Sequence, residues 1–352
     1  MDHMHAVVLG ASGLVGQALV AHLKARADWR VTGVSRKAST LLPHRQICVD
    51  LTDREATHEA LASLDDTTHV FYAARVGSDD VHRDAVVNTR MLVNVVDALL
   101  QDAKRLEHVC LVHGTKWYGS HAGPFRTPAR ESDPRHFPPN FYFDQHDFIT
   151  ARQKGEAWTW STVRPHTVCG VTRDYPYNLF TGLAAYASIC KELQLPLYFP
   201  GAVGAYSCIA QATDAGLLAR AMHWIATNPA CANQDFNVTN GDLFRWSNLW
   251  DSIAHYFGME SGPVRTVKLS LTMSQADKIW DRIVSKYQLA EPRLSSLVNW
   301  SYLDFHLHSA WDSISSPTKL RQFGFQEVID SEEMIFKIFD KLRHSNMIPP
   351  RE

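Results

Sequence analysis

Short apolar runs alternate with amphipathic helical patterns along the first half of the chain. The runs typical of strands cover residues 5–9, 29–34, 46–50, 69–73, 108–113 and 159–164. Between the first two of them, Val15, Leu19 and Leu23 repeat at helical spacing. The near-continuous apolar run 109–112 indicates a strand that is buried on both faces. The alternation therefore predicts an α/β fold with a doubly wound, parallel sheet.

The first strand-like run leads directly into a glycine-rich turn that opens the first helical pattern. Gly10, Gly13 and Gly16 stand in a G-x-x-G-x-x-G arrangement. Glycines at this spacing allow a tight turn, a close approach of the backbone to a pyrophosphate, and close helix–strand packing. The free N–H groups at the helix N-terminus favour the phosphates. The turn predicts a dinucleotide-binding domain of the Rossmann type, and its spacing resembles that of the short-chain dehydrogenase superfamily.

The end of the second strand indicates which cofactor is bound. Enzymes that use NAD usually place Asp or Glu here, to bond the ribose 2′-hydroxyl. This chain has Ser35, Arg36 and Lys37 instead. A guanidinium can bind a 2′-phosphate bidentately and stack on adenine. We therefore expect NADPH as the cofactor.

The second half of the chain reads as mainly helical. Helical patterns cover 178–193, 213–227, 246–257, 274–288 and 332–343, and a strand-like run at 235–238 is expected to return to the sheet. The proline-rich stretch 119–140 predicts a long loop. We expect residues 1–165 to form the Rossmann domain, with 205–240 returning to it. Residues 166–204 and 241–352 are expected to form a smaller, mostly helical, substrate-binding region.

Composition narrows the choice of partners. The 352 residues include 35 Lys or Arg and 37 Asp or Glu, for a formal charge of −2, and 45% are hydrophobic. This balance gives no bulk attraction to nucleic acid or acidic lipid. The six cysteines form no C-x-x-C pair, and the longest uncharged apolar stretch, 178–190, is shorter than a membrane span. We expect a cytoplasmic protein without a signal peptide, a membrane span, a nucleic-acid partner or a metal.

The usual catalytic signature of short-chain dehydrogenases is missing. They carry Tyr-x-x-x-Lys on one helix, where the lysine lowers the tyrosine pKa. No tyrosine of this chain has a lysine four residues later. The missing groups are offered by two other segments, 113–119 after the fifth strand and 139–147 at the start of the next helical pattern. On residue type alone, Lys116 and Tyr142 also fit a solvated charge and a core aromatic.

These two segments resemble the progesterone 5β-reductase/iridoid synthase-like enone reductases, which are atypical short-chain dehydrogenases. Residues 114–118 are similar to the family's G-T-K-x-Y motif, which places its lysine at Lys116. Residues 140–147 resemble its N-F-Y-Y-x-x-E-D motif, which places its tyrosine at Tyr142. The resemblance also covers residues 68–72, the helical pattern around 88–94, Arg164-Pro165, and 236–242 followed by Arg245-Trp246. Phe143 and His146 depart from the motif, which affects the pocket rather than the catalytic pair.

The resemblance implies reduction of an activated C=C bond, with hydride transfer from NADPH to the β-carbon of an enone. It implies that Tyr142 donates to the developing enolate oxygen and that Lys116 supports it and touches the nicotinamide ribose. The residues expected to bind the cofactor are Gly10, Ser12, Gly13, Leu14, Val15, Gly16, Ser35, Arg36, Lys37, Asp50, Leu51, Ala73, Ala74, Thr115, Lys116, Tyr142, Pro165 and Val168. Those expected to line the substrate pocket are Trp117, Phe143, His146 and Tyr177.

Two other functions stay open at this point. One is an extended short-chain dehydrogenase acting on a nucleotide sugar, as an epimerase or dehydratase, against which the split Lys116/Tyr142 pair speaks. The other is a non-catalytic NADP(H)-sensing protein, against which the retention of both residues speaks. The expected partner is a small-molecule enone, and a homodimer is left open.

Overall fold

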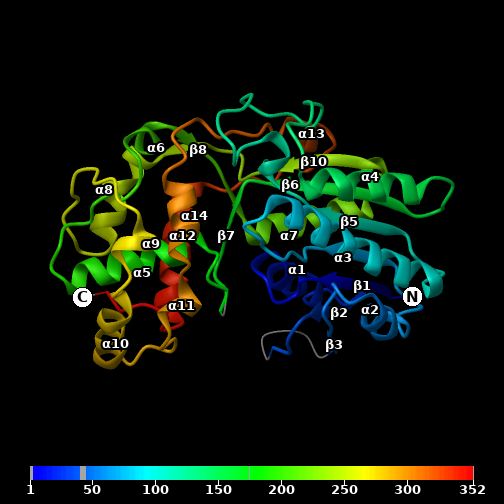
Figure 1. Ribbon diagram of the computed structural model, residues 1–352, viewed down its shortest axis with the longest axis horizontal. Coiled ribbons are helices and arrows are strands. Elements are labelled where there is room, and N and C mark those ends of the chain that lie inside the picture. Colours follow the sequence, from blue (N-terminus) through cyan, green and yellow to red (C-terminus); the bar gives the residue numbers. More distant parts are fainter. Residues whose placement is uncertain (1–2, 40–44, 174, 352) are drawn as a thin grey trace. The chain divides into compact units, whose positions relative to one another are not determined.

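The computed structural model describes residues 3–39, 45–173 and 175–351. The chain divides into two compact units (Figure 1). The first unit contains Met1–His166, Ala215–Thr239 and Ser315–Glu327, and the second contains Thr167–Asp214, Asn240–Ile314 and Val328–Glu352. This division differs from the expected one in that 205–214 belongs to the second unit and 315–327 to the first.

The described residues of the first unit form a seven-stranded sheet in which every neighbouring pair is parallel. Its order is β10-β6-β5-β4-β1-β2-β3. The strands are β1 (Met4–Leu9), β2 (Trp29–Ser35), β3 (Arg45–Cys48), β4 (His69–Tyr72), β5 (His108–Val112), β6 (Thr159–Pro165) and β10 (Gln234–Val238). The order runs outward in both directions from β1, which is that of a doubly wound sheet. The predicted fold class is confirmed.

Helices cover both faces of this sheet. On one face α1 (Leu14–Lys24) packs against α7 (Ala215–Thr227). On the other, α2 (Arg54–Leu61), α3 (Val81–Asp102) and α4 (Phe141–Gln153) pack against one another in that order (Figure 1). Short η2 (Pro229–Cys231) and α13 (Thr318–Gln322) complete the unit. The central strands β1, β4 and β5 are buried at nearly every position because each face of the sheet lies under a helical layer.

Local sequence signals explain where the helices of the first unit begin. The side chains of Asp53, Asp80 and Asn140 each precede a helix and accept hydrogen bonds from its first N–H groups. Such caps satisfy donors that the helix itself leaves unpaired. By contrast, the N-cap residue of α1 is Gly13, and no side chain caps this helix. The first-turn N–H groups of this helix are therefore not occupied by a capping side chain.

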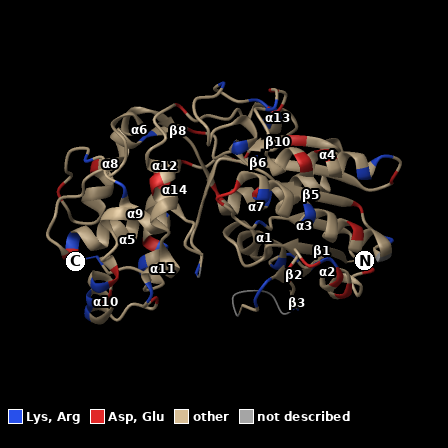
Figure 2. Cartoon of the chain, viewed as in Figure 1, with Lys and Arg blue, Asp and Glu red and all other residues tan. Residues whose placement is uncertain are grey.

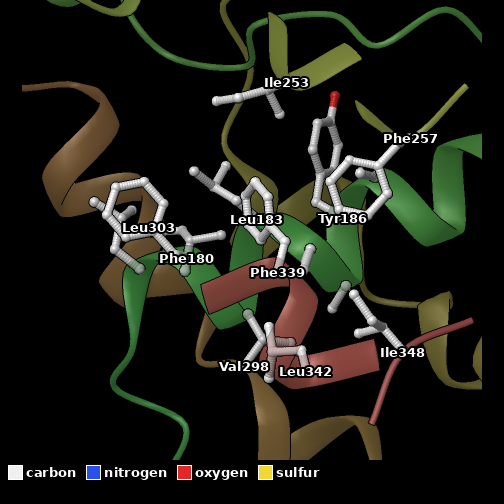
Figure 3. Close-up of a cluster of buried hydrophobic side chains, with 14 of the residues drawn as sticks. Phe180, Leu183, Tyr186, Ile253, Phe257, Val298, Leu303, Phe339, Leu342 and Ile348 are labelled. Carbon is white, nitrogen blue, oxygen red and sulfur yellow. The ribbon is translucent and has the colours of Figure 1, made fainter. Parts of the chain in front are cut away.

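The second unit is mainly helical. It contains the helices α5 (Leu179–Glu192), α6 (Val203–Ser207), α8 (Trp246–Tyr256), α9 (Leu269–Thr272), α10 (Ala276–Tyr287), α11 (Leu294–Leu297), α12 (Trp300–Leu307) and α14 (Ser331–His344). Two short strand pairs join β7 (Thr167–Cys169) with β9 (Ala212–Asp214) and β8 (Ile209–Ala210) with β11 (Phe244–Arg245). Figure 3 shows its apolar core, in which Phe339 of α14 packs against Phe180 of α5 and Phe257. Helix α5 is buried along most of its length, which explains its uninterrupted apolar pattern.

The predicted strands and helices are confirmed, with ends that differ by one or two residues. The region 119–140 is a long connection, as expected, and follows the short 3-10 helix η1 (Thr115–Tyr118). Lys and Arg are interspersed with Asp and Glu over both units, which accords with the small net charge (Figure 2). Within the described part of the chain, no helix has the length and apolar character needed to cross a membrane.

Candidate functional site

The glycine turn after β1 has a geometry that only glycine accommodates. Gly10 has a φ of +79°, and a Cβ at this position would lie 2.7 Å from the carbonyl oxygen of Ala73. A Cβ on Gly16 would lie 2.7 Å from the Cα of Ala11. The turn is held to the sheet because the N–H groups of Gly10 and Ala11 donate to the carbonyl of Val34 at 3.0 and 3.1 Å.

These features fit a dinucleotide pyrophosphate. Of the predicted turn residues, Ser12 is exposed, Gly13 and Val15 are half-buried, and Leu14 packs inward. The backbone at Gly13 is therefore accessible, and the uncapped N-terminus of α1 presents N–H groups and partial positive charge to an anion. The glycines of this turn place no side chain between the backbone and a bound phosphate, so the phosphate is able to approach closely.

Two cations follow β2 at the same edge of the sheet. Arg36 and Lys37 are both exposed, and the hydroxyl of Ser35 donates to the carbonyl of Lys37 at 2.7 Å. Asp50, after β3, is bonded by the N–H and hydroxyl of Thr52 at 3.0 and 2.8 Å. These two hydrogen bonds, and more weakly the charge of Arg36, lower the pKa of Asp50 against the opposing effect of burial.

The remaining predicted cofactor residues of the first unit lie at the carboxyl ends of neighbouring strands. Leu51 is buried after β3, Ala73 and Ala74 are half-buried after β4, and Pro165 ends β6. Ligand crevices of parallel sheets lie at this edge. Val168 belongs to β7 of the second unit and is described only there.

The hydroxyl of Tyr142 lies beside Gly114, the residue that precedes the Lys116 turn after β5. Lys116 is part of η1, which begins at Thr115. Tyr142 lies in the first turn of α4, and its hydroxyl is 3.3 Å from the position that a Cβ on Gly114 would take. The carbonyl oxygen of Pro165 is 3.7 Å from the same point. The structure thus brings together the two predicted catalytic segments, with the phenol directed to the strand ends.

Asn140 connects the two segments. Its side-chain nitrogen donates to the carbonyl oxygen of Lys116 at 2.9 Å, and its side-chain oxygen accepts from the N–H of Tyr142 at 3.0 Å. The Nε2 of His136 lies 2.9 Å from the same carbonyl. The side chain of this one asparagine therefore caps α4 and also joins α4 to η1. Nothing in the local sequence pattern specifies the contact with the Lys116 carbonyl.

Lys116 is half-buried and its charge is disfavoured. Burial, and to a lesser extent the charge of Arg75, lowers the pKa of Lys116 to about 8, while Asp84 opposes the shift. His121 is affected in turn, since burial and the charge of Lys116 lower the pKa of its imidazole to about 4. At neutral pH the lysine is mostly charged and close to losing its proton. Perturbed lysines of this kind are typical of functional sites.

Three of the residues predicted to line the substrate pocket lie close together, one on η1 and two on α4. Trp117 contacts Phe143 and His146 edge-on, with ring centres 5.0 and 5.2 Å apart. The guanidinium of Arg135 lies 5.2 Å from the ring centre of Trp117 and 5.1 Å from that of Phe143. Trp117 and Phe143 are buried in this cluster. Their role toward the substrate stays a prediction.

Tyr177, the fourth of these residues, lies in the second unit. It is 49% exposed, and its ring stands perpendicular to that of Tyr302 at 5.9 Å. Among the residues that the structure describes, no group of three or more His, Cys, Asp or Glu side chains is arranged to hold a metal.

The imidazole of His113 packs against Tyr142, with ring centres 4.7 Å apart. It is buried, and its two ring nitrogens have no hydrogen-bond partner among the described residues. Burial, followed by the charge of Arg164, lowers the pKa of His113 well below its ordinary value. The neutral ring therefore adds no positive charge beside Lys116. No motif in the sequence singles out His113.

A parallel sheet with an uncapped glycine turn after β1, and a tyrosine and a lysine beyond β5, defines a Rossmann-fold enzyme of the short-chain dehydrogenase/reductase class. The profile of the PRISE-like Rossmann-fold domain matches residues 41–349. The chain belongs to this family and is an oxidoreductase.

Relatives of assigned activity agree with the family. The chain is 33% identical to (S)-8-oxocitronellyl enol synthase of Catharanthus roseus, over 98% of this chain and 92% of that protein. It is 32% identical to 3-oxo-Delta(4,5)-steroid 5-beta-reductase of Arabidopsis thaliana, over 98% and 93%.

Solved structures share the fold at low sequence identity. The Bordetella bronchiseptica enzyme WbmG, in complex with NAD, superposes with a TM-score of 0.68 at 16% identity, over 98% of this chain and 96% of that one. UDP-glucose 4-epimerase of Thermotoga maritima, with UDP-glucose, gives 0.70 at 16% identity, over 97% and 99%. At this identity the likeness shows the architecture alone.

Proposed function

We propose that the protein reduces the C=C bond of an α,β-unsaturated carbonyl compound with NADPH, by hydride transfer to the β-carbon. The observation that carries the proposal is the meeting of the Tyr142 hydroxyl and the Lys116 turn at Gly114. The names of two relatives support it, since a 3-oxo-Δ4,5-steroid 5β-reductase acts on a conjugated ketone and an enol synthase forms an enol.

In this reaction, bound NADPH supplies the hydride. The protein's task is to orient the substrate and to stabilise charge. Addition of hydride at the β-carbon moves negative charge onto the carbonyl oxygen. The phenolic O–H of Tyr142 donates to that oxygen, and its fixed position on α4 means that little reorganisation is needed when the charge develops. A proton from the solvent then adds to the α-carbon of the enolate to give the saturated carbonyl compound.

Lys116 supports the same step through its positive charge. The ammonium favours the enolate over the neutral enone because it interacts with charge that is present only after hydride transfer. It also binds the nicotinamide ribose. Lys116 is partly buried, which lowers its pKa to about 8, and electrostatic interactions are stronger at such a position than in water.

The choice of NADPH over NADH rests on the end of β2. Arg36 and Lys37 are exposed there, and neither of the two positions carries an acid that would bond a free 2′-hydroxyl. A guanidinium pairs with a 2′-phosphate through charge-assisted hydrogen bonds. WbmG binds NAD, but it is only 16% identical to this chain. The residues at the end of β2 select between NAD and NADP, and they differ among proteins of this fold.

The first test is consumption of NADPH by the purified protein with cyclic and linear enones, with the product identified in the same samples. A saturated ketone or aldehyde is expected. Tyr142→Phe should bind NADPH like the wild type and lose about 10²–10³-fold in kcat, the effect of removing one oxyanion donor. Tyr287→Phe, in the second unit, is the matched control and should leave kcat unchanged.

Other products would overturn the proposal in distinct ways. An allylic alcohol would mean that the carbonyl is reduced instead of the C=C bond. Turnover of a nucleotide sugar without net NADPH consumption would point to an epimerase or dehydratase. Tight binding of NADPH with no turnover across the enone panel would indicate a sensing protein. Unchanged kcat in Tyr142→Phe would remove this residue from the reaction.

A further inference from the structure

A fully buried arginine holds the turn that carries Lys116. Arg164 lies on β6, and its guanidinium carbon is 3.7 Å from the ring centre of Trp117. Its Nη1 donates to the hydroxyl of Tyr118 and to the carbonyl of Glu131, both at 3.3 Å. Trp117 and Tyr118 directly follow Lys116 within η1. The position of the lysine backbone therefore depends on the arginine.

Asp235 on β10 provides the opposite charge for this arginine. One carboxylate oxygen lies 3.1 Å from Nη2 of Arg164 and accepts from the hydroxyl of Thr162 at 2.5 Å. Asp235 pairs with Thr162 across the two parallel strands, so the backbone register sets this contact. Burial alone would raise the pKa of Asp235, but its interactions with His146 and Arg164 outweigh burial and hold the pKa well below its ordinary value. The aspartate is charged at neutral pH.

The same carboxylate oxygen also reaches the helix that carries Tyr142. His146 lies one turn after Tyr142 on α4, and its Nε2 is 3.3 Å from Oδ1 of Asp235. The imidazole is held in this orientation by edge-on contacts with Trp117 and Trp160, with ring centres 5.2 and 5.1 Å away. Asp235 is therefore in contact with one residue that fixes η1 and one residue that belongs to α4.

We infer that Asp235 is a positioning residue, which sets the distance between the Lys116 turn and the Tyr142 helix through Arg164 and His146. The effect that this positioning has on catalysis rests on the proposed function. Its physical basis is the cost of a buried charge. Removing one partner of a buried pair leaves the other uncompensated, so the arginine must move or rearrange its contacts with Trp117 and Tyr118. A shift of about 1 Å at a reacting group is able to cost about 10²-fold in rate.

Two variants test the inference, and they differ in how strongly they are expected to disturb folding. Asp235→Asn keeps the shape and removes the charge beside Arg164, whereas His146→Gln leaves that pair intact and removes the imidazole with its contacts to Asp235, Trp117 and Trp160. Arg152→Gln is the matched control, since Arg152 lies on the same helix and pairs with Glu156 at its surface. We expect kcat for enone reduction to fall about 10–100-fold in Asp235→Asn and by a smaller factor in His146→Gln, with the KM for the enone little changed. The control should match the wild type.

A second readout does not depend on turnover. Competitive chemical labelling measures the pKa of Lys116 in each folded variant. When η1 loosens, the ammonium becomes better solvated and its pKa should rise from about 8 toward its ordinary value of 10.5. A merely structural role would lower the thermal midpoint and leave both kcat of the folded protein and the Lys116 pKa as they are, which overturns the inference. So would a rise in KM alone in His146→Gln, which would place this residue in the pocket lining.

The two proposals fail in different ways. A wild-type protein that reduces no enone refutes the proposed function, and the labelling of Lys116 still decides the positioning role. If Asp235→Asn does not fold, His146→Gln decides by the same two measurements.

Discussion

Asn140 donates its side-chain amide to the backbone carbonyl of Lys116 at 2.9 Å, and through this bond the residue before the Tyr142 helix holds the turn that bears the lysine. Asparagine is suited to both tasks because its amide has an acceptor for the helix N–H and a donor for the carbonyl. The proposed catalytic pair comes from two segments 26 residues apart, and this side chain is one of the contacts that join them.

Asn140→Ser separates the two tasks. Serine caps a helix about as well as asparagine, but its short side chain has no amide to reach the Lys116 carbonyl. We expect a thermal midpoint close to that of the wild type and a fall in kcat of about tenfold, whereas Asn140→Ala should lower both, the stability by about 1 kcal/mol. Asp330→Ala, at the N-cap of α14, is the control that loses a cap and keeps kcat. Equal kcat in Asn140→Ser and the wild type would show that the tie to Lys116 has no catalytic consequence.

Lys116 should give the reaction an alkaline limit. Burial lowers its pKa to about 8, so the charged form that favours the enolate prevails below this pH and is lost above it. We expect kcat/KM for NADPH, which reports the free enzyme, to be level near neutral pH and to fall about tenfold per unit above pH 8. Lys116→Arg should move the limit upward, because a guanidinium stays charged.

Asp84 provides a finer check of the same point. Its negative charge raises the pKa of Lys116, so Asp84→Asn should move the alkaline limit to lower pH. Asp97→Asn, on the same helix α3, should leave the limit in place. A limit that does not respond to Asp84 or to Lys116→Arg would have to be assigned to another group.

Arg36 should decide between the two nicotinamide cofactors. Arg36→Ala removes a guanidinium that we place against the 2′-phosphate, so the Kd for NADPH should rise about 10–100-fold while that for NADH stays the same. The measurement is fluorescence titration of each cofactor against the purified protein. Arg26→Ala, which changes an exposed arginine just after α1, is the control. If NADH already binds as tightly as NADPH in the wild type, the assignment of the 2′-phosphate to Arg36 is wrong.

Three histidines at the amino ends of the central strands should make the first unit sensitive to acid. His5, His69 and His108 are buried, and burial lowers the pKa of the first two to about 4 and of the third to about 3. Each is neutral in the folded state and takes up a proton on unfolding below its ordinary pKa of 6.5. Since the unfolded state binds more protons there, stability is lost as the pH falls from about 6.5 toward 4, by up to about 1.4 kcal/mol per pH unit for each histidine.

The thermal midpoint, followed from pH 7 to pH 4.5, measures this loss. His108→Gln keeps groups that are able to bond Thr159 and Ser161 and removes one titrating site, so its midpoint should fall less steeply with acid. His255→Gln, at an exposed position of α8, should follow the wild-type slope. Identical slopes in all three proteins would show that His108 is not responsible for acid sensitivity.

The sheet, the glycine turn and the two segments that supply Lys116 and Tyr142 could all be predicted from the amino-acid sequence. Strands such as 109–112 are apolar on both faces because helices cover both, and this pattern is visible without a structure. The turn at Gly10 is equally local, since its φ of +79° is a property of a few residues. The two cations after β2 could also be located from the sequence, because they directly follow the predicted end of a strand.

The tertiary structure decided how these parts meet. The bond from Asn140 to Lys116 joins residues of two elements, and nothing in either local pattern specifies it. The contact of Asp235 with Arg164 and His146 joins three elements whose residues are up to 89 positions apart, and it depends on the register of β10 against β6. The lowered pKa of Lys116 likewise arises from burial by distant parts of the chain. Residue types and their periodicity predict single helices and strands. The distances between side chains of different elements, and the burial of those side chains, are set only when the elements pack together.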